Sequence, residues 1–315
     1  MSQSEAFPTF DAACCQELRA AAERQLQAQA PQFAVQGRLL LHALSPDQWP
    51  AEWHLPWWLG QSLRLDEERW QALTVANLLG LAHIFLADRL NERPATVDDD
   101  SDLPLAEAFH QAALALLHDL FDDHPRFWQH YAQSMAQWRQ AQRHADDPVP
   151  LTFDEWQQDG LRLCAWRGAP LKITAVGTLL LAHQDATIPR LSQTLDQMLI
   201  AQVLLDHLDD WRDDLAAGRF NAFALYAQRH PSRLAAQMPL ASRVLAMLMT
   251  GQSRGYTALV DAHYAQALRG SEGLNCVGLQ RFLAAQRLDA VQRCGQLVDA
   301  AARHFQRAIR ASLQP

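Results

Sequence analysis

Five aspartates lie close together near the middle of the chain, at spacings that would place them on one side of a helix. They are Asp206, Asp209, Asp210, Asp213 and Asp214. At about 100° per residue they span roughly 140° of arc, and Leu199 and Val203 precede them on the same side. Carboxylates repel one another and are disfavoured at a helix C-terminus, so divalent cations would stabilise them. A solvated acidic face and a magnesium site at the rim of an apolar pocket are both open readings.

A second segment, 70–92, shows the same order of residues on one side of a helix. An apolar stretch comes first, and three polar side chains follow it, namely Asp88, Asn91 and Glu92. Because an apolar row that ends in acids occurs twice, we expect the two helices to share one cavity with the acids at its rim. The expected lining is Leu81, Ile84, Phe85, Leu199 and Val203.

The elements that must position these side chains are all expected to be helices. Helical periodicity and good helix formers dominate, and no strand-like alternation of useful length occurs. Thr152 and Glu155 form a capping box, Pro189 suits the first turn of a helix, and Gly218 suits its end. We predict an all-α fold in one domain, residues 1–315. Helices are expected near 11–29, 66–91, 103–121, 125–144, 153–166, 170–184, 189–217, 239–269 and 277–311, with loops at 98–102 and 146–150.

Composition narrows the class of function. The net charge of -8 argues against a protein that binds a nucleic-acid backbone. The five cysteines show no metal-ligand spacing, which suits small apolar thiols in a reducing compartment. The N-terminus lacks a signal pattern, and the apolar runs fall short of the roughly 20 residues that a membrane span needs. We therefore expect a cytoplasmic protein without a transmembrane segment.

The two acidic segments together resemble those of the class I isoprenoid synthases. That superfamily contains the terpene cyclases, the squalene and phytoene synthases, and the chain-elongating prenyltransferases. The run Asp210-x-x-Asp213-Asp214-x-x-x-Gly218-Arg219 is similar to the second acidic motif of the squalene and phytoene synthases. The resemblance covers roughly residues 70–225.

Two departures from the family pattern are visible in these segments. Asp206, Asp210 and Asp214 match the spacing of the terpene cyclase motif, but aspartate stands at every position. The first motif lacks the doubled aspartate that is usual in the family, and reads Asp88-x-x-Asn91-Glu92.

The resemblance implies a helical barrel in which the two motifs face each other and hold two or three Mg²⁺ ions that bind a prenyl diphosphate. The implied metal ligands are Asp88, Asn91, Glu92, Asp206, Asp210, Asp213 and Asp214, of which Asp88, Asp210 and Asp214 are the implied catalytic residues. The diphosphate candidates are Arg89, Arg167, Arg219 and Lys172, the only lysine.

The implied reaction is ionisation of an allylic prenyl diphosphate with release of pyrophosphate. Terpene cyclisation ranks first, and head-to-head coupling and chain elongation are alternatives. A helical metal phosphohydrolase that uses His83, His118, Asp119 and Asp206 is a different enzyme class that the residues leave open. A catalytically decayed binding protein and a homodimeric assembly also remain open.

Overall fold

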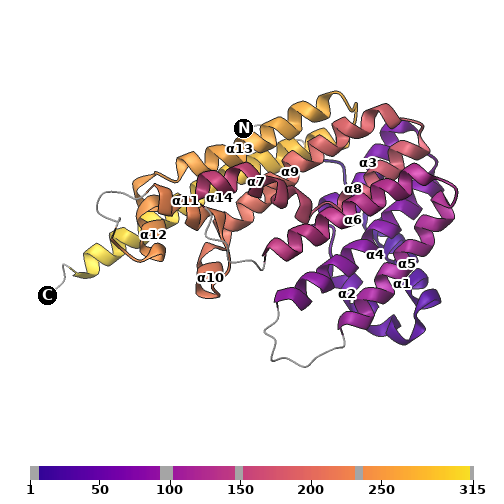
Figure 1. The fold of residues 1–315 in the computed structure, drawn as a ribbon, viewed down its shortest axis with the longest axis horizontal. Coiled ribbons are helices and arrows are strands. Elements are labelled where there is room, and N and C mark those ends of the chain that lie inside the picture. Colours follow the sequence, from indigo (N-terminus) through magenta and orange to yellow (C-terminus); the bar gives the residue numbers. More distant parts are fainter. Residues whose placement is uncertain (1–6, 93–101, 146–151, 231–236, 313–315) are drawn as a thin grey trace.

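The computed structural model describes residues 7–92, 102–145, 152–230 and 237–312, and every regular element in these ranges is a helix. The prediction of an all-α protein is therefore confirmed for the described chain. Figure 1 shows the N-terminal helices gathered at one end of the molecule and the helices of the last third reaching towards the other.

The first half of the chain supplies the helices around the cavity described below. They are α1 (Ala12–Gln29), α2 (Ala34–Ala43), α3 (Pro50–Leu63), α4 (Glu67–Glu92), α5 (Asp102–Phe121), α6 (Pro125–Ala145), α7 (Phe153–Arg167) and α8 (Leu171–Leu181), with a short 3₁₀ turn at Pro31–Phe33. Helices α2 and α3 were not among the predicted segments. Helix α3 starts at Pro50, contains Pro56 and buries Trp53 and Trp58, so packing overrides a composition poor in helix formers.

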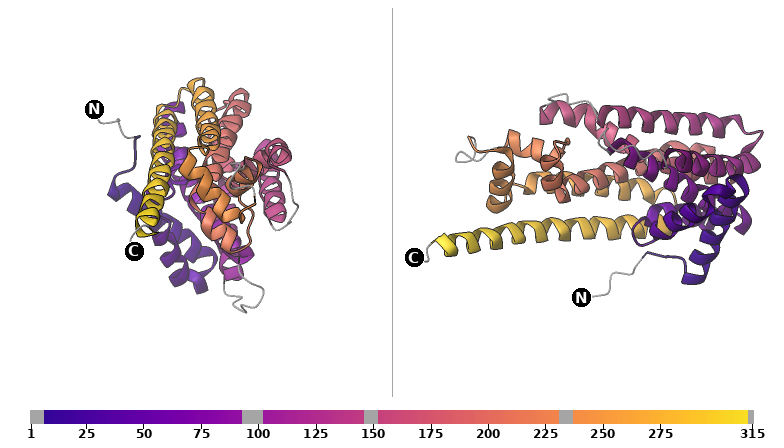
Figure 2. Two further views of the ribbon diagram at one scale, coloured as in Figure 1. Left: turned by 90° about the vertical axis from the view of Figure 1, so that its left-hand side faces the viewer. Right: turned by 90° about the horizontal axis from the view of Figure 1, so that it is seen from below.

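The second half contains the acidic helix and the C-terminal helices. After a 3₁₀ turn at Asp185–Thr187 come α9 (Ile188–Asp209), α10 (Trp211–Ala216), α11 (Ala222–Arg229), α12 (Leu240–Thr250), α13 (Arg254–Glu272) and α14 (Val277–Ser312). Figure 2 shows α14 as a long helix along one side of the molecule.

Two predicted helices are each divided in two. The segment 189–217 is interrupted at Asp210, which leaves helical geometry with φ −95° and ψ 4°. The segment 239–269 is interrupted at Gly251, whose φ of 71° is a left-handed conformation that glycine adopts without strain. The capping box of Thr152 and Glu155 is present, and Gly218 follows α10 with φ 69°.

Helix α4 lies between two hydrophobic cores. Leu73 and Ala76 belong to the larger core, while Leu79 and Leu86 belong to a smaller one that α1 and α5 complete. Within the described chain the stretch Glu67–Asn91 is long and apolar enough to cross a membrane, and 61% of its most apolar window is buried. A core helix of a soluble protein passes the same test, so the absence of a membrane span stays a prediction.

Candidate active-site cavity

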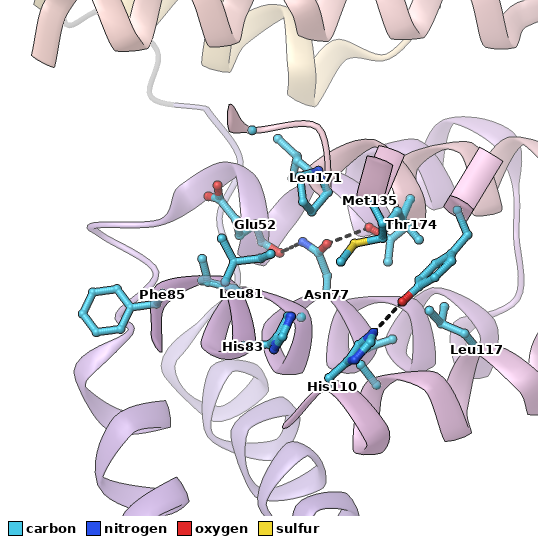
Figure 3. A pocket seen from close by; sticks show the side chains of 18 of the residues that line it. Glu52, Asn77, Leu81, His83, Phe85, His110, Leu117, Met135, Leu171 and Thr174 are labelled. Atoms are coloured by element: carbon cyan, nitrogen blue, oxygen red, sulfur yellow. Dashed lines mark hydrogen bonds between the residues drawn. The ribbon is translucent and has the colours of Figure 1, made fainter. Parts of the chain in front are cut away.

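A cavity of about 190 Å³ opens between α3, α4, α5, α6 and the junction of α7 with α8. Most of its wall is apolar. The wall includes Leu81 and Ile84 of α4, Leu117 of α5, Met135 of α6 and Leu171 of α8. Figure 3 shows these elements around the space, with a few polar side chains among them.

One side of α4 supplies the longest continuous part of the wall. Asn77, Leu81, Ile84, Phe85 and Asp88 recur at helical spacing and all line the cavity. The apolar row that precedes Asp88 in the sequence thus faces this space. By contrast, Leu199 and Val203 of α9 are not among its described lining residues. They pack in the main core, and Leu199 lies beneath the backbone of Gly168, where an added Cβ would meet its side chain at 2.2 Å.

Asn77 connects three helices at the wall of the cavity. Its Nδ2 donates to the backbone oxygen of Glu52 at 2.7 Å, and its Oδ1 accepts from Thr174 Oγ1 at 2.9 Å. Both hydrogen bonds are drawn in Figure 3. Because a buried amide without partners would be destabilising, this arrangement holds α3, α4 and α8 together around the space.

The opposite part of the wall contains polar groups that are neutral at neutral pH. His83 and His110 stack with their ring centroids 4.6 Å apart, and His110 Nε2 lies 2.6 Å from the Tyr131 hydroxyl. Burial lowers the pKa of His83 to about 4 and also lowers the pKa of His110. Burial raises the pKa of Tyr131 to about 12. This wall therefore adds hydrogen-bonding capacity without adding charge.

The lining includes two acidic side chains, Glu52 of α3 and Asp88 of α4, and one arginine, Arg167 of α7. Gln142 of α6 donates to Asp88 Oδ1 and accepts from Asn91 Nδ2 at 3.4 Å, so it bridges two of the three polar residues of the first acidic segment. The side chain of Glu92, another predicted metal ligand, lies outside the described residues. Arg89 pairs with Asp102 at 3.6 Å and lies over the Phe85 ring.

The break between α7 and α8 positions Arg167. Helix α7 ends at this residue, and Gly168, Ala169 and Pro170 turn the chain into α8. Glycine leaves room for Leu199 here, since an added Cβ at position 168 would lie 2.2 Å from a terminal methyl group of Leu199 and that side chain would have to shift. The turn is closed by hydrogen bonds from Ala169 N to Trp166 O and from Leu171 N to Gly168 O, both 3.1 Å. Arg167 thus stands at the cavity on a well-defined turn.

The second acidic segment lies at the end of α9, and its carboxylates influence one another. Asp206 is exposed to solvent on one side, yet desolvation by the surrounding protein raises its pKa to about 6. The charges of Asp210 and Asp209 contribute to this rise in pKa, and Arg167 opposes it. Burial also raises the pKa of Asp209 and of Asp210. Because its charge acts on Asp206, Arg167 lies within electrostatic reach of α9 as well as at the cavity.

Asp214 serves a structural role in this arrangement. It is buried, and its carboxylate accepts from Arg219 Nε at 3.0 Å and from Asn221 Nδ2 at 2.8 Å. Asn221 also donates to the backbone oxygen of His207 at 2.9 Å. The predicted metal ligand Asp214 and the predicted diphosphate ligand Arg219 therefore bond to each other, and they tie α10 to α9 and α11.

Replacing Asp214 by asparagine is expected to lower the free energy of unfolding by about 1–3 kcal/mol in the absence of metal. The two donors bond to different carboxylate oxygens, and asparagine has an NH₂ group, which cannot accept, in place of one of them. The matched control is Asp213→Asn, the same change at the exposed neighbouring position, which should alter stability by less than about 0.5 kcal/mol. Urea unfolding measures both variants. Equal stabilities for the two would contradict the structural role of Asp214.

Lys172 lies on α8 and away from the cavity lining. It is buried, and its ammonium group pairs with Asp196 of α9. This pair neutralises a charge inside the core and connects the two helices. The ammonium group of the only lysine is thus paired with a carboxylate of a neighbouring helix, which the sequence pattern did not indicate.

In the described part of the chain, neither the carboxylates implied as magnesium ligands nor the phosphohydrolase residues are gathered into a metal-binding group. Across the described residues, no three His, Cys, Asp or Glu side chains form a group that could hold a metal ion. His118, which the phosphohydrolase reading requires, stacks on Trp128 with ring centroids 4.2 Å apart. His83 is hydrogen-bonded to the backbone oxygen of Ala106 at 2.9 Å.

Several lining residues were not predicted as site residues, and Glu52 is the most notable of them. It lies in the first turn of α3, a helix that the sequence pattern did not reveal. Trp49, Tyr131 and Thr174 also line the cavity without having been singled out. An acidic residue two positions after Trp49-Pro50 could have signalled a helix N-terminus. No protein-family model matches the chain, and no curated protein matches it.

Proposed function

We propose that this protein ionises an allylic prenyl diphosphate in a Mg²⁺-dependent reaction that releases pyrophosphate, in the manner of a class I isoprenoid synthase. The observation that carries the proposal is the position of Arg167. This cation lines an apolar cavity together with Asp88 and also acts electrostatically on Asp206 at the other acidic segment. A diphosphate at Arg167 would leave its hydrocarbon chain next to the cavity.

The lining suits a hydrocarbon chain better than a nucleotide or a sugar. Leu81, Ile84, Leu117, Met135 and Leu171 offer an apolar surface, and the polar side chains of Asn77 and Thr174 among the lining residues are hydrogen-bonded to each other. Burial of each CH₂ group contributes roughly 0.8 kcal/mol, so a prenyl chain gains affinity along its whole length. The charged end of such a substrate would remain near Asp88 and Arg167.

Of the carboxylates proposed to hold Mg²⁺, Asp88 lines the cavity, whereas the aspartates at the end of α9 are not among its described lining residues. A bound diphosphate would contribute the remaining oxygens. Asp206, Asp209 and Asp210 have raised pKa values, because burial and the neighbouring carboxylates both disfavour the charged forms. A divalent cation would relieve that repulsion. Mg²⁺ commonly takes one or two protein carboxylates and completes its shell with water and phosphate oxygens. Asp88 and Asn91 on α4, Asp206 on α9 and Asp210 at the break after α9 are the residues proposed to hold it.

Bound Mg²⁺ would supply electrostatic stabilisation of the leaving diphosphate. Arg167 would add positive charge on the same group and orient it, because a guanidinium forms paired hydrogen bonds to phosphate oxygens. The apolar wall would exclude water from the allylic cation, and the rings of Phe85 and Tyr131 could stabilise its charge. Cyclisation within one bound chain remains our first choice, with coupling and elongation as alternatives.

The proposal predicts Mg²⁺-dependent release of pyrophosphate from geranyl, farnesyl or geranylgeranyl diphosphate. Asp206→Asn should lower the rate by about 10²-fold, because it removes a proposed metal ligand. The same change at exposed Asp122 serves as the control and should have little effect. A coupled pyrophosphate assay gives the rates, and mass spectrometry identifies the products.

A second readout does not depend on turnover. Mg²⁺ together with inorganic pyrophosphate should raise the Tm of the wild-type protein by a few degrees, because ligands that bind only the folded state stabilise it. Asp206→Asn should show a smaller rise. The proposal is wrong if no prenyl diphosphate is turned over and this thermal shift is absent. Nucleotide phosphatase activity that His118→Ala abolishes would favour the phosphohydrolase instead.

A further inference from the structure

Glu52 is an acidic side chain on the cavity wall without a cationic partner. It lies at the third position of α3, and its backbone oxygen is held by Asn77. Among the described residues no side chain donates a hydrogen bond to its carboxylate and no cation pairs with it; only its own backbone N–H favours the charged form. Figure 3 shows the Glu52 carboxylate in the upper part of the view, to the left of Leu171.

The surroundings of Glu52 explain why this carboxyl is poised to exchange a proton near neutral pH. Burial raises its pKa to about 7, and the bond from its own N–H offsets this only in part. The other titratable or charged residues that line the cavity are His83 and Asp88 of α4, His110 of α5, Tyr131 of α6 and Arg167 of α7. Of these, the histidines and the tyrosine are neutral at pH 7, because burial shifts their pKa values away from it.

A carboxylate that lacks an ion-pair partner in an apolar cavity is destabilising, so its presence indicates a ligand or a chemical step that uses it. The diphosphate cannot be the group that pairs with Glu52, since it is an anion and the carboxylate would repel it. A positively charged hydrocarbon can pair with Glu52, because its charge would offset that of the carboxylate in a site with little water. Trp49 and Phe85, with ring centroids 6.5 Å apart, lie on the same wall and offer aromatic surfaces to such a cation.

We propose that Glu52 is the base of the cavity: its carboxylate faces the cationic hydrocarbon and removes the proton that ends the reaction. In this step a C–H bond next to the cationic carbon breaks, and its electron pair forms the new C=C bond. The proton passes to a carboxylate oxygen of Glu52, and the product leaves as a neutral olefin. The proton is returned to water after release, so no oxidant or other reactant is needed. This inference rests on the proposed function.

The test compares wild-type protein with Glu52→Gln, which keeps the size of the side chain but cannot accept the proton. Each is incubated with Mg²⁺ and farnesyl diphosphate, and the olefin formed per pyrophosphate released is determined by gas chromatography with mass spectrometry. The ratio should fall at least about tenfold in Glu52→Gln, with alcohols from water capture in place of the olefin. In the wild type the ratio should rise with pH through about 7, whereas Glu52→Gln should show no such rise.

A binding experiment separates failure of this inference from failure of the proposed function. Protonated N,N-dimethyloctylamine carries a positive charge at the end of an apolar chain, and calorimetry gives its affinity without any turnover. Wild-type protein should bind it at least about tenfold more tightly than Glu52→Gln does, because the variant lacks the negative charge. Glu68→Gln, at an exposed position in the first turn of α4, is the matched control and should bind like the wild type.

The outcomes are distinct. Equal amine affinities in wild type and Glu52→Gln, or an unchanged olefin ratio, would overturn the role of Glu52 even if pyrophosphate release is confirmed. Amine binding that depends on Glu52 but no turnover of any prenyl diphosphate would overturn the proposed function and the proton-transfer step with it. Glu52 would then stand as a binding site for organic cations.

Discussion

Arg167→Ala is expected to lower Mg²⁺-dependent pyrophosphate release by at least about 10²-fold, the largest effect of any single change to this protein. Arg167 is the one described basic residue that both lines the cavity and acts on the pKa of Asp206. Its loss would remove charge stabilisation of the leaving group and would also raise the pKa of Asp206 further. Pyrophosphate release measured from pH 6 to 9 should therefore fall and shift to higher pH.

Two further variants make this prediction specific. Arg167→Lys keeps the charge but loses the paired hydrogen bonds, so its rate should lie between those of wild type and Arg167→Ala. Arg162→Ala removes an exposed arginine from the same helix, where Arg162 lies over the Trp166 ring, and should leave the rate within about twofold of wild type. If Arg162→Ala lost as much activity as Arg167→Ala, the effect would come from a lower positive charge in general or from a less stable α7. The position of Arg167 at the cavity would then not explain it.

Glu52→Gln is expected to stabilise the protein, and increasingly so as the pH rises. The pKa of this carboxyl is raised from 4.5 to about 7 in the folded protein, so the neutral form is favoured there. Its contribution to stability is therefore fully present below pH 4.5 and is lost as the pH rises through about 7. Because one pKa unit corresponds to about 1.4 kcal/mol, the wild type should lose about 3 kcal/mol by pH 8.

Glutamine carries no charge at any pH, so it avoids this loss. Urea unfolding should give a difference between Glu52→Gln and wild type of below about 1 kcal/mol at pH 5 and about 3 kcal/mol at pH 8. Glu68→Gln lacks the burial and should change stability by less than about 1 kcal/mol, with little dependence on pH. A difference that does not grow with pH would show that the Glu52 carboxyl is not held in its neutral form. Stabilisation by removing a functional group is expected where a site is strained for its task.

The sequence alone was sufficient for the helical class of the fold and for the wall that α4 contributes. Leu81, Ile84 and Phe85 recur at helical spacing before Asp88, and one helix must present such a row on one side whatever surrounds it. The capping box at Thr152 and the helix end at Gly218 follow equally from local backbone chemistry.

The partner of Lys172 depended on the tertiary structure, because it lies on another helix. Lys172 and Asp196 are 24 residues apart, and nothing in either segment indicates their ion pair. The break at Asp210 likewise divides the predicted acidic helix and sends Asp214 to Arg219 and Asn221, although all five aspartates share one helical periodicity in the sequence. Neither the ion pair nor the break is visible in the helical periodicity of the sequence.

The two acidic segments differ in their relation to the cavity, because Asp88 of the first lines it and no aspartate of the second is among its described lining residues. The spacing of the residues in the sequence does not show this difference. Asp88 stands at the cavity because its own helix forms the wall, which is a local property. Glu52 stands there only because α3 packs across α4 through Asn77, and Arg167 only because Gly168 fits against Leu199. Contacts of this kind depend on the shapes of side chains from distant segments that are buried against one another. The local sequence pattern therefore indicates which helices form, and their packing determines which side chains come into contact.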